Sequence, residues 1–110
     1  MHEFSIAQSA IELAEEASGG RRIKRITLEI GELAGVAPEA LAFCFDLATE
    51  GTLAEGAALD VRRIAGTAQC ELCKNIFAAS SRLATCACGS SRICFVHGEE
   101  LIVKSIELQS

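Results

Sequence analysis

Four closely spaced cysteines limit the fold of one segment of this chain more than any other feature of its sequence. Cys70 and Cys73 form a CxxC pair, and Cys86 and Cys88 form a CxC pair after a spacer of twelve residues. A CxxC turn presents two thiolates to one tetrahedral zinc ion, and two such turns on neighbouring hairpins make a zinc ribbon. We therefore expect residues 66–98 to fold around a bound zinc ion.

The second cysteine pair is one residue shorter than a CxxC pair. A CxC pair can chelate one metal ion, but its backbone is more constrained than that of a CxxC turn. Gly89 follows the pair, and its tolerance of positive φ would relieve some of the strain. Cys94, or His97, could instead replace one member of the pair. The identity of the fourth ligand therefore stays open at this point.

Disulfides, ordinary buried thiols and a redox motif account less well for the six cysteines. We expect a cytoplasmic protein, because no apolar run approaches the ~20 residues of a membrane span and the start lacks the pattern of a signal peptide. Thiols stay reduced in that compartment, which favours metal ligands over disulfides. Four cysteines within nineteen positions are too concentrated for a set of ordinary buried side chains. A thioredoxin-like CxxC would open a helix after a strand, and this one does not.

The charge is acidic overall and unevenly distributed. The net charge is −5, which argues against general nucleic-acid binding, because that needs a basic face. Residues 66–98 hold Lys74, Arg82 and Arg92 against Glu71, a net of +2 that leaves −7 on the rest of the chain. Four thiolates around one zinc ion would add about −2 to this segment. The metal-bound segment would then be nearly neutral and attached to an acidic body.

The remaining residues predict two helices and three strands. One helix is expected over residues 3–18, and a second is expected to begin at Pro38 and to end before Gly51. Period-2 patterns predict strands over residues 21–30, 57–64 and 100–108. The first helix should bury an apolar stripe made of Phe4, Ala7, Ala10, Ile11, Ala14 and Ala17.

This order of elements predicts an α+β (α/β-like) fold, with two helices on a small three-stranded mixed sheet and an inserted zinc-ribbon-like subdomain. Because a strand follows the cysteine-rich segment, the chain should leave the main body and return to the same sheet. We expect one domain of residues 1–65 plus 99–110 and a zinc-binding subdomain of residues 66–98.

The amino terminus is a second candidate metal site. Met1-His2-Glu3 places an imidazole and a carboxylate beside the α-amine, which should stay on Met1 because His2 is too bulky for removal of the initiator. The amine, the imidazole and deprotonated backbone amides could form a planar nitrogen site, which suits Ni(II) or Cu(II) rather than zinc. A frayed and solvated terminus is the ordinary alternative.

These motifs, in this order and spacing, give the chain a resemblance to the HypA/HybF family of hydrogenase nickel-incorporation proteins over essentially its whole length. The matching features are Met1-His2-Glu3, Leu28-Glu29-Ile30-Gly31, Pro38-Glu39-Ala40-Leu41, Phe43-Cys44-Phe45, Glu55-Gly56, the Cys70/Cys73 pair, Cys88-Gly89-Ser90, Gly98-Glu99-Glu100-Leu101 and Ile106-Glu107.

The resemblance implies a nickel metallochaperone that delivers Ni(II) to the large subunit of [NiFe]-hydrogenase together with a maturation GTPase, and in some organisms also serves urease. It implies nickel binding through the N-terminal segment with His2 as the essential ligand, and a separate structural zinc site made of two CxxC pairs. Thr85 would align with the third zinc ligand of the family and Cys88 with the fourth. Since threonine is a poor zinc ligand, Cys86 is the expected substitute, with Cys70, Cys73 and Cys88 as the other ligands.

Two further classes of function fit the sequence less well. A zinc-ribbon adaptor in transcription or translation would carry basic and aromatic residues on its ribbon, and this chain has no Tyr or Trp. An enzyme is not expected, because no paired carboxylates, Ser/His/Asp arrangement or phosphate-binding glycine loop is evident, and the zinc ligands leave no open position for water. Cys44 follows the buried stripe of the second helix and is expected in the core. Glu3 is either a second nickel contact or an acidic residue favoured at a helix start. The chain could act as a monomer or a homodimer.

Overall fold

The computed structural model describes residues 2–110, which form two compact units. The first, called here the main unit, comprises the chain up to Glu29 together with Val36–Arg62 and Ile102–Ser110. The second, called the ribbon unit, comprises Ile30–Gly35 and Arg63–Leu101. The domain borders inferred from the sequence, 1–65 with 99–110 and 66–98, stay a prediction.

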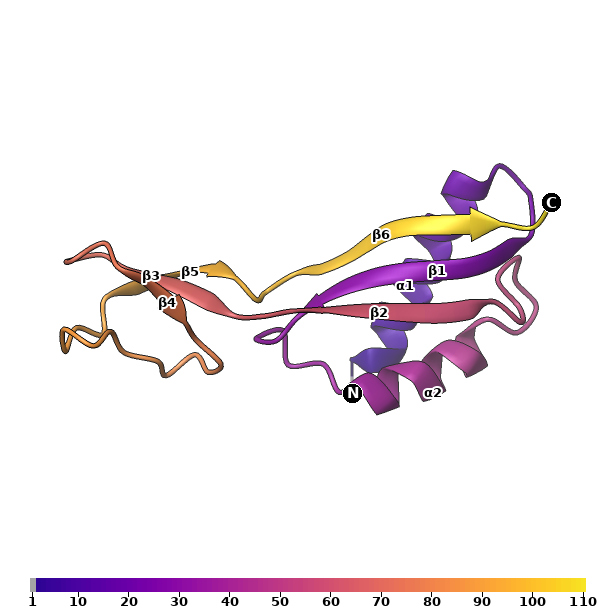
Figure 1. Ribbon diagram of the computed structural model, residues 1–110. Coiled ribbons are helices and arrows are strands. Elements are labelled where there is room, and N and C mark those ends of the chain that lie inside the picture. The colour runs from indigo at the N-terminus through magenta and orange to yellow at the C-terminus, as the bar shows by residue number, and fades with distance from the viewer. Residues whose placement is uncertain (1) are drawn as a thin grey trace. The chain divides into compact units, whose positions relative to one another are not determined.

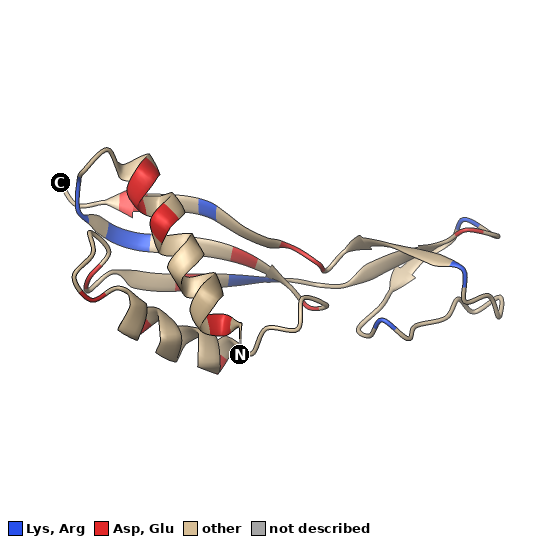
Figure 2. Ribbon diagram, turned by 180° about the vertical axis from the view of Figure 1, so that it is seen from behind, with Lys and Arg blue, Asp and Glu red and all other residues tan. Residues whose placement is uncertain are grey.

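Two helices pack against each other in the main unit, α1 (Glu3–Ser18) and α2 (Pro38–Ala48). Alanines line much of the buried side of α1, and their small side chains permit a close approach by neighbouring elements. From α2, Leu41 and Phe45 are fully buried. Figure 2 shows α1 lying across one face of the strands, with acidic residues spaced along it.

The predicted stripe of α1 is confirmed in its centre and wrong at its ends. Its buried residues follow a spacing of three or four, and they are Ala7, Ala10, Ile11, Ala14 and Ser18. Phe4 is 41% exposed in the first turn, and Ala17 is exposed because Ser18 occupies the buried side of the last turn. The hydroxyl of Ser18 donates a hydrogen bond to the carbonyl of Glu15 (2.9 Å), which satisfies this polar group without water.

A three-stranded mixed sheet forms the other layer, with the strand order β2-β1-β6. The central strand is the most buried, because it has a neighbour on both sides and a helical layer on one face. It also buries the polar Thr27, which the alternating pattern would have placed outside. Figure 1 shows the three strands side by side; they are β1 (Ile23–Gly31), β2 (Ala58–Ile64) and β6 (Leu101–Leu108).

Backbone hydrogen bonds at the two ends of β1 show that it is antiparallel to β6. The Gln109 N–H donates to the Arg22 carbonyl (3.0 Å), and the Gly31 N–H donates to the Glu100 carbonyl (2.8 Å). The partner's number falls as the number along β1 rises, as antiparallel pairing requires. This arrangement, with two helices and a return strand after the cysteine-rich segment, confirms the predicted fold class.

The ribbon unit has a second three-stranded sheet, in the order β4-β3-β5. Both pairings are antiparallel, and a register shift lies between Thr67 and Ala68 of the central strand. These strands are short, which explains why the sequence predicted a ribbon here without individual strand bounds. They are β3 (Thr67–Cys70), β4 (Ile76–Ala78) and β5 (Ile93–His97).

Three glycines let the backbone segments of the ribbon unit cross closely. A Cβ atom on Gly31 would collide with the backbone of Gly98, and one on Gly66 would collide with the carbonyl oxygen of Ala79. The Leu33 N–H donates to the Gly98 carbonyl at 2.6 Å across this crossing. The glycines are therefore required for close packing at this point, and larger side chains would force the segments apart.

In the part of the chain that the structure describes, neither helix is long and apolar enough to cross a membrane.

Candidate metal centres

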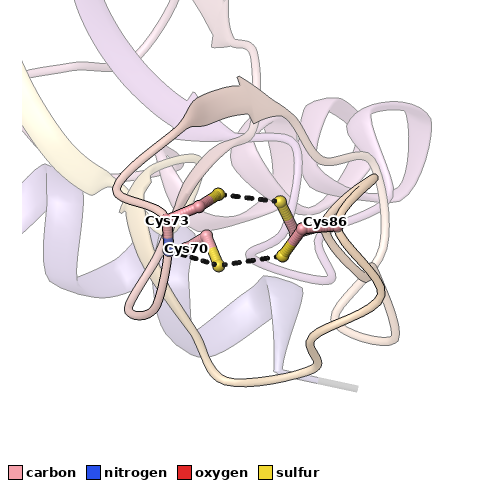
Figure 3. Close-up of side chains that lie close together, drawn as sticks. Cys70, Cys73 and Cys86 are labelled. Atoms are coloured by element: carbon pink, nitrogen blue, oxygen red, sulfur yellow. Dashed lines mark hydrogen bonds between the residues drawn. The ribbon is translucent and has the colours of Figure 1, made fainter.

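The four cysteines of the two pairs come together in the ribbon unit. Cys70 is the last residue of β3 and Cys73 lies in the turn that follows, while Cys86 and Cys88 lie in the connection from β4 to β5. Their four sulfur atoms all lie within 4.8 Å of one another. The Sγ atoms of Cys73 and Cys86 are 3.5 Å apart, and those of Cys70 and Cys88 are 3.7 Å apart (Figure 3).

These separations suit one tetrahedral metal ion. Four sulfurs at about 2.3 Å from a zinc ion would lie about 3.8 Å from one another. The measured contacts of 3.5 and 3.7 Å are close to that value and far longer than a disulfide bond of about 2.05 Å. A donor set of sulfur alone selects zinc or another thiophilic ion over magnesium or calcium. The residues present therefore fit a structural zinc ion.

The first cysteine turn is closed by three interactions that return to Cys70. Its N–H donates to the carbonyl of Asn75 (2.9 Å), and its carbonyl accepts from the Lys74 N–H (3.0 Å). Its Sγ accepts a hydrogen bond from the backbone N–H of Cys73 (3.5 Å). Lys74 has φ 67°, in the left-handed region, which a non-glycine residue seldom adopts. This residue reverses the chain directly after the second sulfur.

The second cysteine turn repeats this pattern with one residue fewer. The Cys86 N–H donates to the carbonyl of Ser90 (2.9 Å), and the Cys86 carbonyl accepts from the Gly89 N–H (2.8 Å). Gly89 has φ 95° and reverses the chain directly after Cys88, as Lys74 does after its own cysteine pair. A CxC pair can thus present two sulfurs on one side because glycine tolerates the tighter reversal. The structure brings Cys86 into the group, whereas Thr85 is exposed.

Thiols of the cluster differ in pKa because their sulfur atoms lie close together. The backbone N–H of Cys73 stabilises the thiolate of Cys70 and lowers the pKa of Cys70 to about 6. The backbone at Ser90 favours the thiolate of Cys88, but the side chains of Cys86 and Cys70 raise the pKa of Cys88 to about 11. Without a cation, the pKa values favour the thiolate of Cys70 and oppose those of Cys73 and Cys88. A divalent ion would remove that opposition.

The two alternative ligands, Cys94 and His97, do not belong to this group of sulfurs. The Cys94 thiol donates to a carboxylate oxygen of Glu71 (3.0 Å), and this contact raises the pKa of Cys94. The His97 Nδ1 lies 3.1 Å from a carboxylate oxygen of Glu100. Both side chains are exposed, and each is engaged with an acidic residue. Cys44, expected in the core, is half-buried on α2.

The second candidate centre is the amino terminus. His2 directly precedes α1, its side chain is exposed, and its carbonyl accepts the first helical hydrogen bond from the Ile6 N–H (3.0 Å). The backbone N–H groups before Ile6 therefore have no acceptor in the hydrogen-bond ladder of the helix. The predicted contribution of the Met1 amine lies outside the described residues.

Glu3 makes a contact that the sequence did not predict. Its Oε2 accepts a hydrogen bond from the backbone N–H of Ala37 (3.2 Å), the residue that precedes α2. This bond is the main reason that the pKa of Glu3 falls to about 2. The two residues are 34 positions apart, and an alanine N–H carries no sequence signal. Local sequence patterns therefore could not reveal this pair.

Comparisons with known proteins place the chain in a family. Residues 1–108 match the family described as hydrogenase/urease nickel incorporation, metallochaperone, hypA. The hydrogenase maturation factor HypA of Geobacter sulfurreducens is 47% identical over 110 residues, which cover 99% of this chain and 100% of that protein. The hydrogenase maturation factor HypA of a Nostoc species is 40% identical over 109 residues, which cover 99% of this chain and 96% of that protein.

Solved structures agree with these sequence matches. The solution structure of the Ni metallochaperone HypA from Helicobacter pylori superimposes with a TM-score of 0.71 at 26% identity, covering 98% of this chain and 97% of that one. The similarity thus extends over both the α/β elements and the cysteine-rich segment. The chain belongs to the HypA family of hydrogenase and urease nickel-incorporation metallochaperones.

Proposed function

We propose that this chain binds Ni(II) at its N-terminus and delivers it during the maturation of [NiFe]-hydrogenase, and of urease where that enzyme is present. Family membership supports this role. The observation that carries it is the exposed His2 at the start of α1, separate in sequence from the four-sulfur cluster of Cys70, Cys73, Cys86 and Cys88. One candidate centre is open to exchange, as a cargo site must be, and the other is made of four converging ligands.

At the N-terminus, the His2 imidazole, the α-amine and deprotonated backbone amides are the proposed nickel ligands. Such a set of nitrogens favours square-planar Ni(II). The amides at the start of α1 are suitable, because they precede the first helical hydrogen bond and their deprotonation would leave the helix ladder intact. Copper(II) should bind at least as tightly, so that selectivity must come from metal supply and from partner proteins.

In the ribbon unit, Cys70, Cys73, Cys86 and Cys88 would hold zinc. A zinc ion bound by four thiolates supplies a crosslink and has no open coordination position for water. We therefore propose a structural ion rather than a reaction centre, and a protein that is not an enzyme. Residues 66–98 would form the zinc-binding subdomain, and residues 1–65 with 99–110 would form the nickel-binding domain.

The proposed partners are a maturation GTPase of the hydrogenase pathway and the large subunit of [NiFe]-hydrogenase, with no nucleic acid or membrane involved. The net charge of −5 is consistent with protein partners and opposes contact with phosphate backbones. We propose a cytoplasmic location, and action as a monomer or a homodimer.

The test is a nickel titration of the zinc-loaded protein, of His2→Gln and of a variant with one residue added before Met1. Both variants should lose nickel binding, while zinc content stays near one ion per chain and α1 remains folded by circular dichroism. His97→Gln is the matched control, because it also removes an exposed imidazole. Nickel affinity that is unchanged in His2→Gln would overturn the proposed site, and a loss in His97→Gln would assign nickel binding to His97 instead.

A further inference from the structure

We propose that Glu3 is a positioning residue, which ties the nickel-binding terminus to the start of α2, and that its carboxylate is not a nickel ligand. The inference rests on the proposed function, because it assigns a role to the residue next to His2. It chooses between two roles that the sequence leaves open for Glu3, a second metal contact and an ordinary acidic residue at a helix start.

The contact joins the beginnings of two helices. Glu3 is the first residue of α1, and its Oε2 accepts the N–H of Ala37, which directly precedes α2. The carbonyl of Ala37 in turn accepts the first hydrogen bond of α2, from the Leu41 N–H (2.9 Å). Glu3 is thus bonded to the residue at which α2 begins.

Among the described residues, Glu3 is the acceptor of this N–H group, which α2 does not satisfy with a side chain of its own. In a capping box this N–H would be accepted by Glu or Gln at the third helical position, but α2 has Ala40 there. A carboxylate at this point accepts a backbone donor and lies near the positive ends of two helix dipoles. The local chemistry therefore favours an ionised Glu3 that stays on Ala37.

The donor of this hydrogen bond, Ala37, is held in place by the packing of α2. Leu41 and Phe45 of α2 are fully buried, as are Ala7 and Ala10 of α1, and the two helices pack against each other within the main unit. Ala37 is itself exposed, but its carbonyl is bonded to the buried Leu41, so its backbone is anchored to the packed helix, whereas a chain terminus ordinarily frays. A side chain that bonds to Ala37 orders the backbone at Glu3 and at the residue before it.

This ordering would raise nickel affinity without a bond to the metal. His2 precedes Glu3, and its imidazole is exposed. A terminus whose first turn is already held loses less conformational freedom when nickel gathers its nitrogen ligands, and pre-organisation of this kind strengthens binding. The contact with Ala37 thus gives Glu3 a role in position, and the proposal leaves coordination to the nitrogen ligands.

The first experiment compares Glu3→Ala and Glu3→Gln in a nickel titration followed by absorption spectroscopy. Glu3→Ala should weaken nickel binding about tenfold, since it removes the acceptor of a charge-assisted hydrogen bond. Glu3→Gln keeps an oxygen acceptor and should recover affinity to within about twofold of wild type. The nickel absorption bands should be the same in all three proteins. A Glu3→Gln protein that is as weak as Glu3→Ala and has shifted bands would identify the carboxylate as a ligand and overturn the proposal.

A second experiment removes the donor in place of the acceptor. Ala37 has φ −83°, close to the angle that proline imposes, so Ala37→Pro deletes the N–H with little strain at that residue. Ala37→Pro should weaken nickel binding as Glu3→Ala does, and combining the two should cause no further loss. Two losses that add in the double variant would overturn the proposal. Glu12→Gln, which removes an exposed charge from the same helix, is the control and should leave affinity unchanged.

The contact is also tested apart from nickel, by hydrogen exchange at the Ala37 amide in the nickel-free protein. Exchange should be slower in wild type than in Glu3→Ala, and equal rates would overturn the proposal even if nickel binds as expected. Conversely, nickel binding that is unaffected by His2→Gln would overturn the proposed function, while slow exchange at Ala37 would still support the contact. The two failures are thus distinguishable.

Discussion

The two candidate metal centres differ in how much of the fold builds them. The cluster of four thiols is assembled by two turns in the ribbon unit, which bring together residues up to 18 positions apart. Two of its members, Cys70 and Cys86, are buried. The N-terminal centre is supported by one exposed imidazole, by the first turn of α1 and by the contact of Glu3 with Ala37.

This difference teaches what each centre is suited to do. Releasing an ion from a site that needs two turns to form should disrupt the fold around it, because metal binding and folding are then coupled. A site at the start of an intact helix can gain and lose its ion while the helix remains. Removing a cysteine ligand should therefore unfold the ribbon unit, whereas removing His2 should leave the fold unchanged.

The largest expected effect is that of Cys70→Ser. Zinc content should fall from about one ion per chain to nearly none, because one of the four ligands is removed. The ribbon unit should then unfold, since structural zinc contributes roughly 10 kcal/mol or more to the folding of small domains. Hydrogen exchange should accelerate throughout β3, β4 and β5, whereas α1 and α2, which belong to the main unit, should stay protected. Metal analysis combined with exchange measured by mass spectrometry checks both statements.

The control for this experiment is Cys94→Ser, which removes an exposed thiol from the same unit. It should keep its zinc, because Cys94 is engaged with Glu71 and lies outside the four-sulfur group. Loss of zinc from the Cys94 variant, with retention in the Cys70 variant, would show that the ligands were assigned wrongly.

The sequence predicted both candidate metal centres but not the backbone contacts that determine their geometry. Cysteine spacing and periodicity are local signals, so the cluster and the elements of the main unit could be predicted from them. The spacing alone left Cys86 and Cys94 open, and Cys86 was expected only from the family resemblance. The structure brings Cys86 into the group of sulfurs, where the Ser90 carbonyl and Gly89 close the short turn.

Errors at the ends of elements have a similar cause. Phe4 fits the helical stripe by period but is exposed, because periodicity does not show where a neighbouring element stops. The contact of Glu3 with Ala37 was equally invisible, since it joins residues 34 positions apart through a backbone group. Sequence patterns thus predict the structure of a single element, but they do not predict contacts between two elements that are distant in the sequence.

The next prediction concerns the pH dependence of nickel binding at the N-terminal centre. Nickel affinity should fall by at least about a thousandfold between pH 8 and 5.5, since the α-amine, the imidazole and every coordinating backbone amide must lose a proton to bind. The pKa of Glu3 is lowered to about 2, so this carboxylate keeps its charge throughout the range and should not contribute. Titration by competition with a chelator at several pH values checks this, and a flat profile would indicate other ligands.

A smaller effect is expected from Gly66→Ala in the ribbon unit. The added methyl group would collide with the carbonyl oxygen of Ala79, a backbone atom that cannot rotate away. It should also disturb the N–H of Gly66, which donates to Glu32 Oε1 (2.9 Å). We expect a loss of roughly 2–3 kcal/mol in the unfolding free energy of the zinc-loaded protein. Gly56→Ala is a comparison for backbone conformation, since Gly56 has positive φ but open space around its Cα.

The smallest effect distinguishes two arginines of the ribbon unit. Arg82 pairs with Glu99, donates to the Leu33 carbonyl (3.2 Å) and stacks over the Phe95 ring at 5.7 Å. Arg92 makes a single ion pair, with Glu71 at 3.9 Å, and is more exposed. Exposed pairs contribute little because solvent screens them, so Arg92→Ala should hardly change the free energy of unfolding and Arg82→Ala should lower it by about 1 kcal/mol.

Chemical denaturation of the zinc-loaded variants measures both, and equal costs would mean that the contacts of Arg82 do not stabilise the unit. If Arg82→Ala also left zinc content unchanged, the metal and these contacts would stabilise the ribbon unit independently.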